Sequence, residues 1–372
     1  MSLDTVMLGL DTCSGDMGTD FDLQKSTQAW VDAAVPLLME LPDLRVALYG
    51  DREPIKNALQ KHSSPELNER LGVIHSKYHF DMEGKVQPSH KRRDRHKTTY
   101  WKALDDLSHN LISGIVSATS TDTLIVYANS VLGAHEYRAH VKCSPPIPVN
   151  LPNRHGGNDV LLDCGANKNT KESFMSMFAV MGVTYSQVFH NKKYPTVGLL
   201  SIGTEEKKST GFLSKVDKDL RRHFEDQYSG YIEPNGLGGL FDGYTDVMVV
   251  DGLTGNFILK SIEAMSAFAR EALKDEIINP QGNEITRPFK KTRNMIGGYL
   301  LQDAFNSLNN RFASEQYNGA PILGAKGQIF KAHGSSDTNG LRNAIRNAYT
   351  SIKSKAHDKF DYRLRENLQH YF

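Results

Sequence analysis

The chain has few cysteines and almost no excess of charge of either sign. Its 372 residues contain three cysteines, which lie far apart at Cys13, Cys143 and Cys164. Such a set excludes a disulfide framework and a CxxC metal site, and it is typical of a reducing compartment. The 44 Lys and Arg residues are balanced by 43 Asp and Glu residues. The chain therefore has no overall field for nucleic acid or a membrane, and any electrostatic recognition must be local.

Long apolar runs and several catalytic motifs are also missing. No stretch reaches about 18 apolar residues, and the first residues lack the basic flank of a signal peptide, so we expect a soluble, cytoplasmic protein. The sequence has no Walker A motif, no dinucleotide fingerprint and no Gly-x-Ser-x-Gly elbow. His75 and His79 are four apart but lack the neighbouring Glu of a zinc helix. We expect neither a metal nor a cofactor.

Residues 246–263 contain the most informative pattern. Residues 246–250 are typical of a strand buried on both faces, and apolar residues from Phe257 onward follow a helical period. Between them lies the sequence DGLTGN (residues 251–256), with Asp251, Thr254 and Asn256 among its polar side chains. Its glycines allow a ligand to approach the backbone, and a helix that begins there points free N–H groups outward. The turn suits an anion, although most such turns in α/β proteins bind nothing.

Short apolar runs recur along the chain, and helical patterns lie between most of them. Strands separated by helix-length crossovers predict a largely parallel sheet that is covered on both faces. We therefore expect an α/β protein with three α/β/α layers, as a single domain over residues 1–372. The runs occupy residues 6–10, 45–49, 123–128, 160–164, 196–202 and 246–250.

Polar, glycine-rich turns follow five of the predicted strands. The carboxyl ends of parallel strands line one edge of a sheet, so we expect these turns to converge on one site. Beside residues 251–256, they comprise residues 11–16 (with Asp11, Gly15 and Asp16), Asn129 and Ser130, residues 163–167 (with Asp163 and Asn167), and residues 201–209 (with Lys208).

A sixth stretch, residues 317–336, packs glycines, Lys331 and His333 around short apolar segments. It leads into a helix that is expected to begin near Asp337, with Ser335 or Ser336 as its cap. The free amides of that helix, together with Lys331 and His333, suit a phosphate group. An edge strand followed by an ordinary cap is the alternative interpretation.

Two further segments favour contact with other molecules. Residues 90–97 form a dense positive run that includes Arg92, Arg93 and Arg95; a solvated loop is its default interpretation, and an acidic partner is the alternative. Residues 257–277 and 295–313 predict two amphipathic helices joined by a polar tip at residues 279–294. They form an arm, at approximately residues 255–315, that we expect to pack on the sheet or on a second subunit.

Taken together, these motifs resemble the phosphate acyltransferase (PlsX) family. The resemblance rests on LDCGAN (residues 162–167), FAVMG (178–182), GLLSIG (198–203) followed by EEKK (205–208), DGLTGN (251–256), YNGA (317–320) and KAHG (331–334). It implies the α/β/α fold of isocitrate and isopropylmalate dehydrogenases and phosphotransacetylases. It also implies a homodimer formed through the paired helices, and transfer of an acyl group from acyl-[acyl-carrier protein] to inorganic phosphate for phospholipid synthesis. Lys208 and Asn256 correspond to polar residues at the centre of the family's site.

Several positions depart from the family pattern. The N-terminal motif MGGD is here CSGD (residues 13–16), and Val131 replaces a glycine in the loop with Asn129 and Ser130. A β-branched residue at a position that requires φ > 0 would force a rearrangement. The family docks on membranes through an apolar tip, but this tip is polar apart from Ile285 and Phe289. Peripheral contact with the inner face of the membrane thus stays an open alternative to a purely cytoplasmic location.

These features favour an acyltransferase that works by positioning and charge. Phosphate is already anionic near neutral pH and a thiolate is a fair leaving group, so little general-base help is needed. We assign the catalytic role to Lys208, Asn256 and His333, and carrier-protein contact to Arg92, Arg93 and Arg95. Two other interpretations stay open: a short-chain transferase that uses coenzyme A, and a weakened paralogue that binds the carrier protein or a lipid intermediate as a scaffold. Phosphate and substrate binding is assigned to Asp11, Gly15, Asp16, Asn129, Ser130, Asp163, Asn167, Asp251, Thr254, Lys331 and Ser335.

Overall fold

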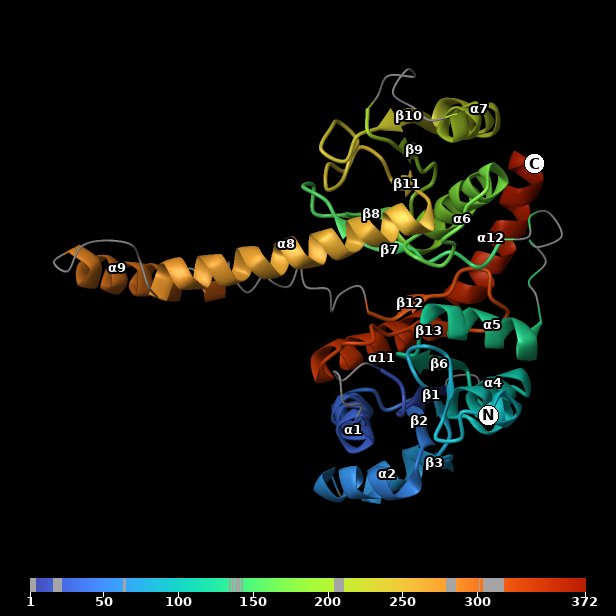
Figure 1. Ribbon diagram of the computed structural model, residues 1–372, viewed down its shortest axis with the longest axis vertical. Helices are drawn as coiled ribbons and strands as arrows, with labels where there is room; N and C mark the ends of the chain where they lie inside the picture. Colours follow the sequence, from blue (N-terminus) through green and yellow to red (C-terminus); the bar gives the residue numbers. More distant parts are fainter. Residues whose placement is uncertain are drawn as a thin grey trace.

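In the part of the chain that the structure describes, the strands form two separate sheets and one short hairpin (Figure 1). The computed structural model describes residues 5–15, 22–62, 65–133, 135, 137, 141, 143–203, 211–278, 286–300, 302–303 and 318–372. The six-stranded sheet has the order β12 (Ala320–Pro321), β13 (Ile329–Lys331), β6 (Gly114–Ser117), β1 (Val6–Asp11), β2 (Leu44–Gly50) and β3 (Leu71–His75). The five-stranded sheet has the order β10 (Tyr228–Ile232), β9 (Val197–Leu200), β11 (Val247–Val249), β8 (Asn158–Leu162) and β7 (Val149–Pro152).

Neighbouring strands in both sheets are mostly parallel, as predicted. The antiparallel pairs among the described residues are β12 with β13, β7 with β8, and the hairpin of β4 (His79–Phe80) with β5 (Val86–Gln87). In the five-stranded sheet, β11 is paired on both sides and its three residues are buried, so the prediction of a doubly buried strand is confirmed. The sequence predicted one sheet, whereas the structure divides the strands between two.

Helices cover both faces of the six-stranded sheet. The sheet and these helices form the first lobe. The helices α1 (Leu23–Glu40) and α11 (Thr338–Lys353) pack on one face, and α4 (Thr99–Ser108) and α5 (Thr121–Leu132) on the other. Buried Leu8 and Leu10 of β1 face the α1 side, while Tyr49 of β2 faces the α4 side. This lobe also contains α2 (Arg52–Leu59), η1 (Gln60–His62), α3 (Pro65–Arg70) and η2 (Arg92–Lys97).

The five-stranded sheet is layered in the same way and forms the second lobe. The helices α6 (Glu172–Phe189), α7 (Gly211–Phe224) and α12 (Ala356–Tyr371) cover one face, and the start of α8 (Gly252–Ile278) covers the other. The short η5 (Glu225–Gln227) links α7 to β10. The apolar stripe predicted on α6 is confirmed as core, with Phe178 and Met181 completely buried. The α/β class is thus established, and a single domain over residues 1–372 stays a prediction.

One predicted strand is wrong. Residues 123–128 belong to α5, and the strand in this region is β6, four residues long and just upstream. Thr123, Leu124 and Ala128 are buried at a helical spacing, while Val126 between them is 54% exposed. The β-branched residues suggested a strand, but burial of one helical face of α5 overrides that weak preference.

The helical arm extends away from both lobes (Figure 1). The prediction that residues 279–294 interrupt its helices is wrong for residues 286–294, because α9 (Thr286–Leu300) already begins at Thr286. Pro288 lies in the first turn, where a backbone N–H has no helical partner to lose. Residues 279–285 and most of the predicted second helix beyond Leu300 lie outside the described residues. Among the helices that the structure describes, none combines the length and apolarity needed to cross a bilayer.

Candidate active site where the two lobes meet

The start of α8 is pressed against the loop that follows β8. A Cβ added at Gly255 would lie 2.0 Å from the backbone carbonyl oxygen of Asp163. A Cβ added at Gly252 would lie 2.5 Å from the backbone carbonyl oxygen of Asn167. Asp251 caps the helix by accepting hydrogen bonds from Leu253 N at 3.1 Å and Thr254 N at 3.0 Å. The two glycines and the cap therefore fix where α8 begins. Thr254 is exposed.

Asp163 and Asn167 hold this loop together. Asp163 Oδ1 accepts from Ile147 N at 3.0 Å and Ala166 N at 3.2 Å, while Oδ2 accepts from Asn167 N at 2.7 Å and Asn167 Nδ2 at 3.0 Å. Burial raises the pKa of Asp163, and these hydrogen bonds act in the opposite direction. Because these bonds occupy both carboxylate oxygens, Asp163 and Asn167 stabilise the loop.

Asn256 stands on the exposed side of this junction. Its side chain lies against Gly165, whose added Cβ would come within 3.4 Å of it. Lys260 and Glu263 follow at i+4 and i+7, so the three side chains share one face of α8. This face is directed toward the loop after β13, in the other lobe.

Lys260 makes that contact between the lobes. Its Nζ lies 2.7 Å from His333 Nε2 and 2.7 Å from Glu263 Oε2. An ammonium group only donates, so Nε2 accepts from Lys260; on the other side of the ring, Nδ1 lies 2.8 Å from Ser335 Oγ and 3.4 Å from Ser335 N. Burial lowers the pKa of His333; Lys260 and Lys331 lower it further, and Glu263 opposes them.

Lys331 is the second cation of the cluster. Its half-buried Nζ donates to the carbonyl oxygens of Ala118 at 3.2 Å and Ala332 at 2.6 Å. Burial, with a smaller contribution from the nearby Lys260, lowers the pKa of Lys331 to about 7. Lys260, Lys331 and His333 thus lie together, and Glu263 is the carboxylate found among them in the described part of the chain. Such an excess of basic groups suits an anion.

Asn318 positions the loop that contains His333. Its Oδ1 accepts from His333 N at 2.6 Å, and its Nδ2 donates to Ser336 Oγ at 2.9 Å. The expected capping role of Ser335 or Ser336 is wrong, because Asp337 caps α11 by accepting from Gly340 N. The two serines instead shape the turn before the helix.

The end of β1 reaches the same loop. Gly15 has a φ of +123°, and a Cβ added there would lie 3.1 Å from the Gly334 carbonyl oxygen. Asp11 is buried and accepts from Ser117 Oγ at 2.8 Å, while its other carboxylate oxygen has no partner among the described residues. Burial raises the pKa of Asp11, and the neighbouring hydroxyl groups of Thr99 and Ser117 act in the opposite direction.

The other predicted site residues lie either outside the described residues or away from this cluster. Lys208 and Asp16 lie outside the described residues, although β9, which precedes Lys208, pairs directly with β11 beside the start of α8. Asn129 and Ser130 are in the third turn of α5, and Ser130 Oγ donates to the Val126 carbonyl oxygen. They are not at the end of a strand, so the structure does not bring them to this site.

The positive run forms the 3₁₀ helix η2 at the start of α4. Arg92, Arg93 and Arg95 are exposed, with Arg95 5.6 Å from the centre of the Trp101 ring. Buried Asp94 accepts from Lys97 Nζ at 2.9 Å. Since Thr99, just after η2, lies beside Asp11, the exposed arginines border the carboxyl edge of the first lobe.

Sequence reasoning missed three residues of the site. Lys260 and Glu263 could have been found, because their spacing from Asn256 places all three on one face of the predicted helix. Asn318 gave no such signal, since its contact with His333 depends on the pairing of β12 with β13.

Comparisons with solved structures agree with the fold. The fold resembles a phosphotransacetylase from Streptococcus pyogenes (TM-score 0.57, 13% identity, 95% of this chain and 94% of that one) and EutD phosphotransacetylase from Staphylococcus aureus (TM-score 0.52, 13% identity, 95% and 94%). The chain is thus a two-lobed α/β protein whose fold is like that of these phosphotransacetylases.

Sequence similarity identifies the family. The model of the family described as "Fatty acid synthesis protein" matches residues 6–359, and the chain belongs to that family. The chain is 33% identical to the phosphate acyltransferase of Photobacterium profundum, covering 98% of this chain and all of that protein. It is 30% identical to the phosphate acyltransferase of Clostridium novyi, covering 95% and 98%. We therefore assign the chain to the acyltransferases, as the sequence motifs predicted.

Proposed function

We propose that this protein transfers a fatty acyl group from acyl-[acyl-carrier protein] to inorganic phosphate and so supplies acyl phosphate for phospholipid synthesis. The observation that carries the proposal is the contact of Lys260, on α8 of the second lobe, with His333 of the first lobe. The contact supports a site that contains Lys260, Lys331 and His333, with Asn256 one turn before Lys260 on the same face of α8. Relatives named phosphate acyltransferases support the choice of acceptor.

In the proposed reaction, a phosphate oxygen attacks the thioester carbonyl carbon. The new C–O bond forms as the C–S bond breaks, and the electron pair leaves on the carrier's sulfur. Lys260 and Lys331 hold the phosphate and offset the negative charge that develops on the carbonyl oxygen. His333 accepts from Lys260 through Nε2 and so orients the ammonium group. The backbone amides near Asn256 and Ser335 add fixed donors, and Lys208 is proposed as a further cation.

The test is to mix purified protein with palmitoyl-[acyl-carrier protein] and phosphate. Free thiol and a hydroxylamine-reactive acyl phosphate are expected in equal amounts, and both should require phosphate. Binding of the carrier without phosphate-dependent thiol release would contradict the proposal and favour a scaffold. A faster reaction with acetyl or butyryl coenzyme A would instead indicate a short-chain transferase.

We further propose that Arg92, Arg93 and Arg95 bind the acidic surface of the carrier protein. These side chains are exposed on η2, at the border of the candidate site. Charge reversal of Arg92 and Arg93 to Glu is expected to weaken carrier binding by about tenfold at low salt and less at high salt, because exposed charges are screened. Surface plasmon resonance at two salt concentrations measures this effect. Reversal of exposed Lys56 and Lys61, at α2 and η1, is the control, and equal binding by both variants would contradict the assignment.

A homodimer formed through the arm is also proposed. Along α8 and α9 the arm exposes large apolar side chains, which a second copy of the arm would cover. They include Met265, Phe268, Phe289, Tyr299 and Leu300, each between 65% and 77% exposed. Contact of the arm with a membrane surface is the alternative, and sedimentation with and without vesicles distinguishes the two.

A further inference from the structure

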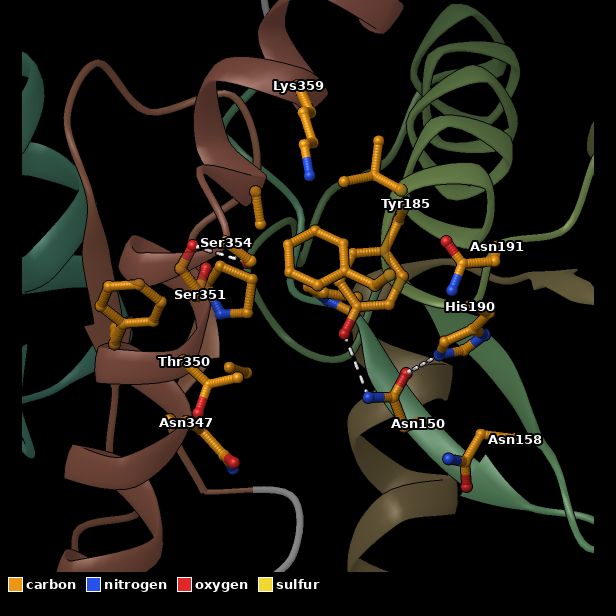
Figure 2. Close-up of a pocket in the computed structure, with 18 of the residues that line it drawn as sticks. Asn150, Asn158, Tyr185, His190, Asn191, Asn347, Thr350, Ser351, Ser354 and Lys359 are labelled. Atoms are coloured by element: carbon orange, nitrogen blue, oxygen red, sulfur yellow. Dashed lines mark hydrogen bonds between the residues drawn. The ribbon is translucent and has the colours of Figure 1, made fainter. Parts of the chain in front are cut away.

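A cavity of about 500 Å³ lies between the lobes (Figure 2). The end of α6, β7 and the start of β8 form its wall in the second lobe. The start of α12, also in the second lobe, contributes Ala356 and Lys359, and β12 and α11 form the wall in the first lobe. Its size is within the range of small-molecule sites in proteins, which bind in concave pockets with a few fixed polar groups.

The polar lining of this cavity is almost entirely uncharged. Among the described residues that line it there is no carboxylate, and Lys359 supplies the cation. Burial lowers the pKa of His190, which is therefore neutral at pH 7. The other polar side-chain groups are five carboxamides and four hydroxyls, from Asn150, Asn158, Asn191, Asn318, Asn347, Thr350, Ser351, Ser354 and Tyr185. Carboxamides both donate and accept, which matches a ligand with several hydroxyl groups, and a single ammonium matches one anionic group.

An aromatic pair lies on the α6 side of the cavity. The rings of Tyr185 and Phe189 are stacked with their centres 4.4 Å apart. Asn150 is fixed between two side chains, because it donates to Tyr185 Oη at 3.0 Å and its Oδ1 lies 3.0 Å from His190 Nε2 (Figure 2). The negative face of an aromatic ring attracts weakly positive C–H groups, such as those on one face of a sugar ring.

We propose that this cavity is a second ligand site, separate from the phosphate site, and that it takes a sugar phosphate. The sugar hydroxyls bind the carboxamides of both lobes, its ring packs beside Tyr185 and Phe189, and its phosphate binds Lys359. A ligand that contacts both walls binds best at one separation of the lobes.

Asn318 lies between this cavity and the candidate active site and contacts residues of both. Its backbone oxygen accepts from Asn347 Nδ2 at 2.8 Å, and both residues line the cavity. Its side chain bonds to the loop of His333 and Ser336, as described above. A ligand beside Asn347 thus lies one residue away from the contacts that hold His333.

Isothermal titration calorimetry of the full-length protein with glucose 6-phosphate tests the proposal. We expect a dissociation constant below about 1 mM, with glucose alone at least about tenfold weaker, and with the affinity unchanged when inorganic phosphate fills its own site. Lys359→Gln removes the proposed phosphate contact, and Asn158→Ala removes one proposed hydroxyl contact. The first should weaken binding about tenfold and the second by a smaller factor.

The control is Lys56→Gln, which changes an exposed lysine on α2 and should bind glucose 6-phosphate as the unmodified protein does. Absence of binding at about 10 mM would overturn the proposal. So would equal binding by Lys359→Gln and Lys56→Gln, or displacement of glucose 6-phosphate by equimolar phosphate, which would place it in the phosphate site. Calorimetry needs no turnover, so binding by a protein without acyl transfer activity would contradict the proposed function alone.

Discussion

Replacement of Lys260 by methionine is expected to lower phosphate-dependent acyl transfer by about 100-fold or more, a loss typical of removing one group that stabilises developing charge. Methionine keeps much of the length of the side chain but removes the ammonium group that contacts His333 and Glu263. Because the Lys260 side chain is 49% exposed, its ion pair adds little to stability and the variant should fold. Steady-state kinetics with phosphate as the varied substrate measure the effect.

The kinetic pattern identifies what Lys260 does. A rise in KM for phosphate with unchanged kcat indicates ground-state binding, and an equal fall in kcat and kcat/KM indicates a contact made only in the transition state. Lys260→Arg keeps the charge and should recover part of the activity. Lys274→Met is the matched control, because Lys274 is an exposed lysine further along α8. If Lys260→Met and Lys274→Met had the same activity, the role assigned to Lys260 would be wrong.

Gly255→Ala is expected to destabilise the protein by about 3 kcal/mol or more, or to prevent soluble expression. The added methyl group would lie 2.0 Å from the Asp163 carbonyl oxygen and 2.9 Å from Val250 Cγ1. One of these contacts is with backbone, so no rotamer change relieves it, and α8 must move away from the loop after β8. Urea denaturation followed by circular dichroism measures the change in free energy of unfolding.

Gly72→Ala is the matched control for this substitution. Gly72 lies on the edge strand β3, and a Cβ added there meets no atom within 4 Å. Alanine should be neutral or slightly stabilising there, because glycine weakens a strand. A Gly255→Ala protein with the stability of the Gly72→Ala protein would show that α8 tolerates a shift at its first turn, and the close approach would not be structurally important.

Much of the second lobe could be predicted from the sequence. Residues 246–250 and α6 have apolar patterns that only a buried strand and a buried helix explain, and both are confirmed. Other elements were obscured by local composition. The strand β6 is four residues long and begins with glycine, while the β-branched residues of α5 favoured a strand. In both cases burial against the rest of the lobe determines the structure.

The candidate site was only partly visible in the sequence. Turns after strands identified Asp163, Asp251 and Asn256, but their separate tasks depend on hydrogen bonds that the sequence does not show. Lys260 and His333 are 73 residues apart and belong to different lobes. Their contact follows from how two sheets are placed relative to each other, which no local pattern specifies. The proposed roles of Lys208 and Asp16 stay predictions.

The order of the strands has a consequence for synthesis of the chain. The six-stranded sheet takes β12 and β13 from residues 320–331, and α11, which covers one of its faces, comes later still. While the ribosome is making the second lobe, β6 therefore remains an open edge next to uncovered apolar surface. Unpaired edges of this kind recruit strands from other chains. A nascent chain stalled before residue 320 should accordingly need a chaperone far more than the finished protein does.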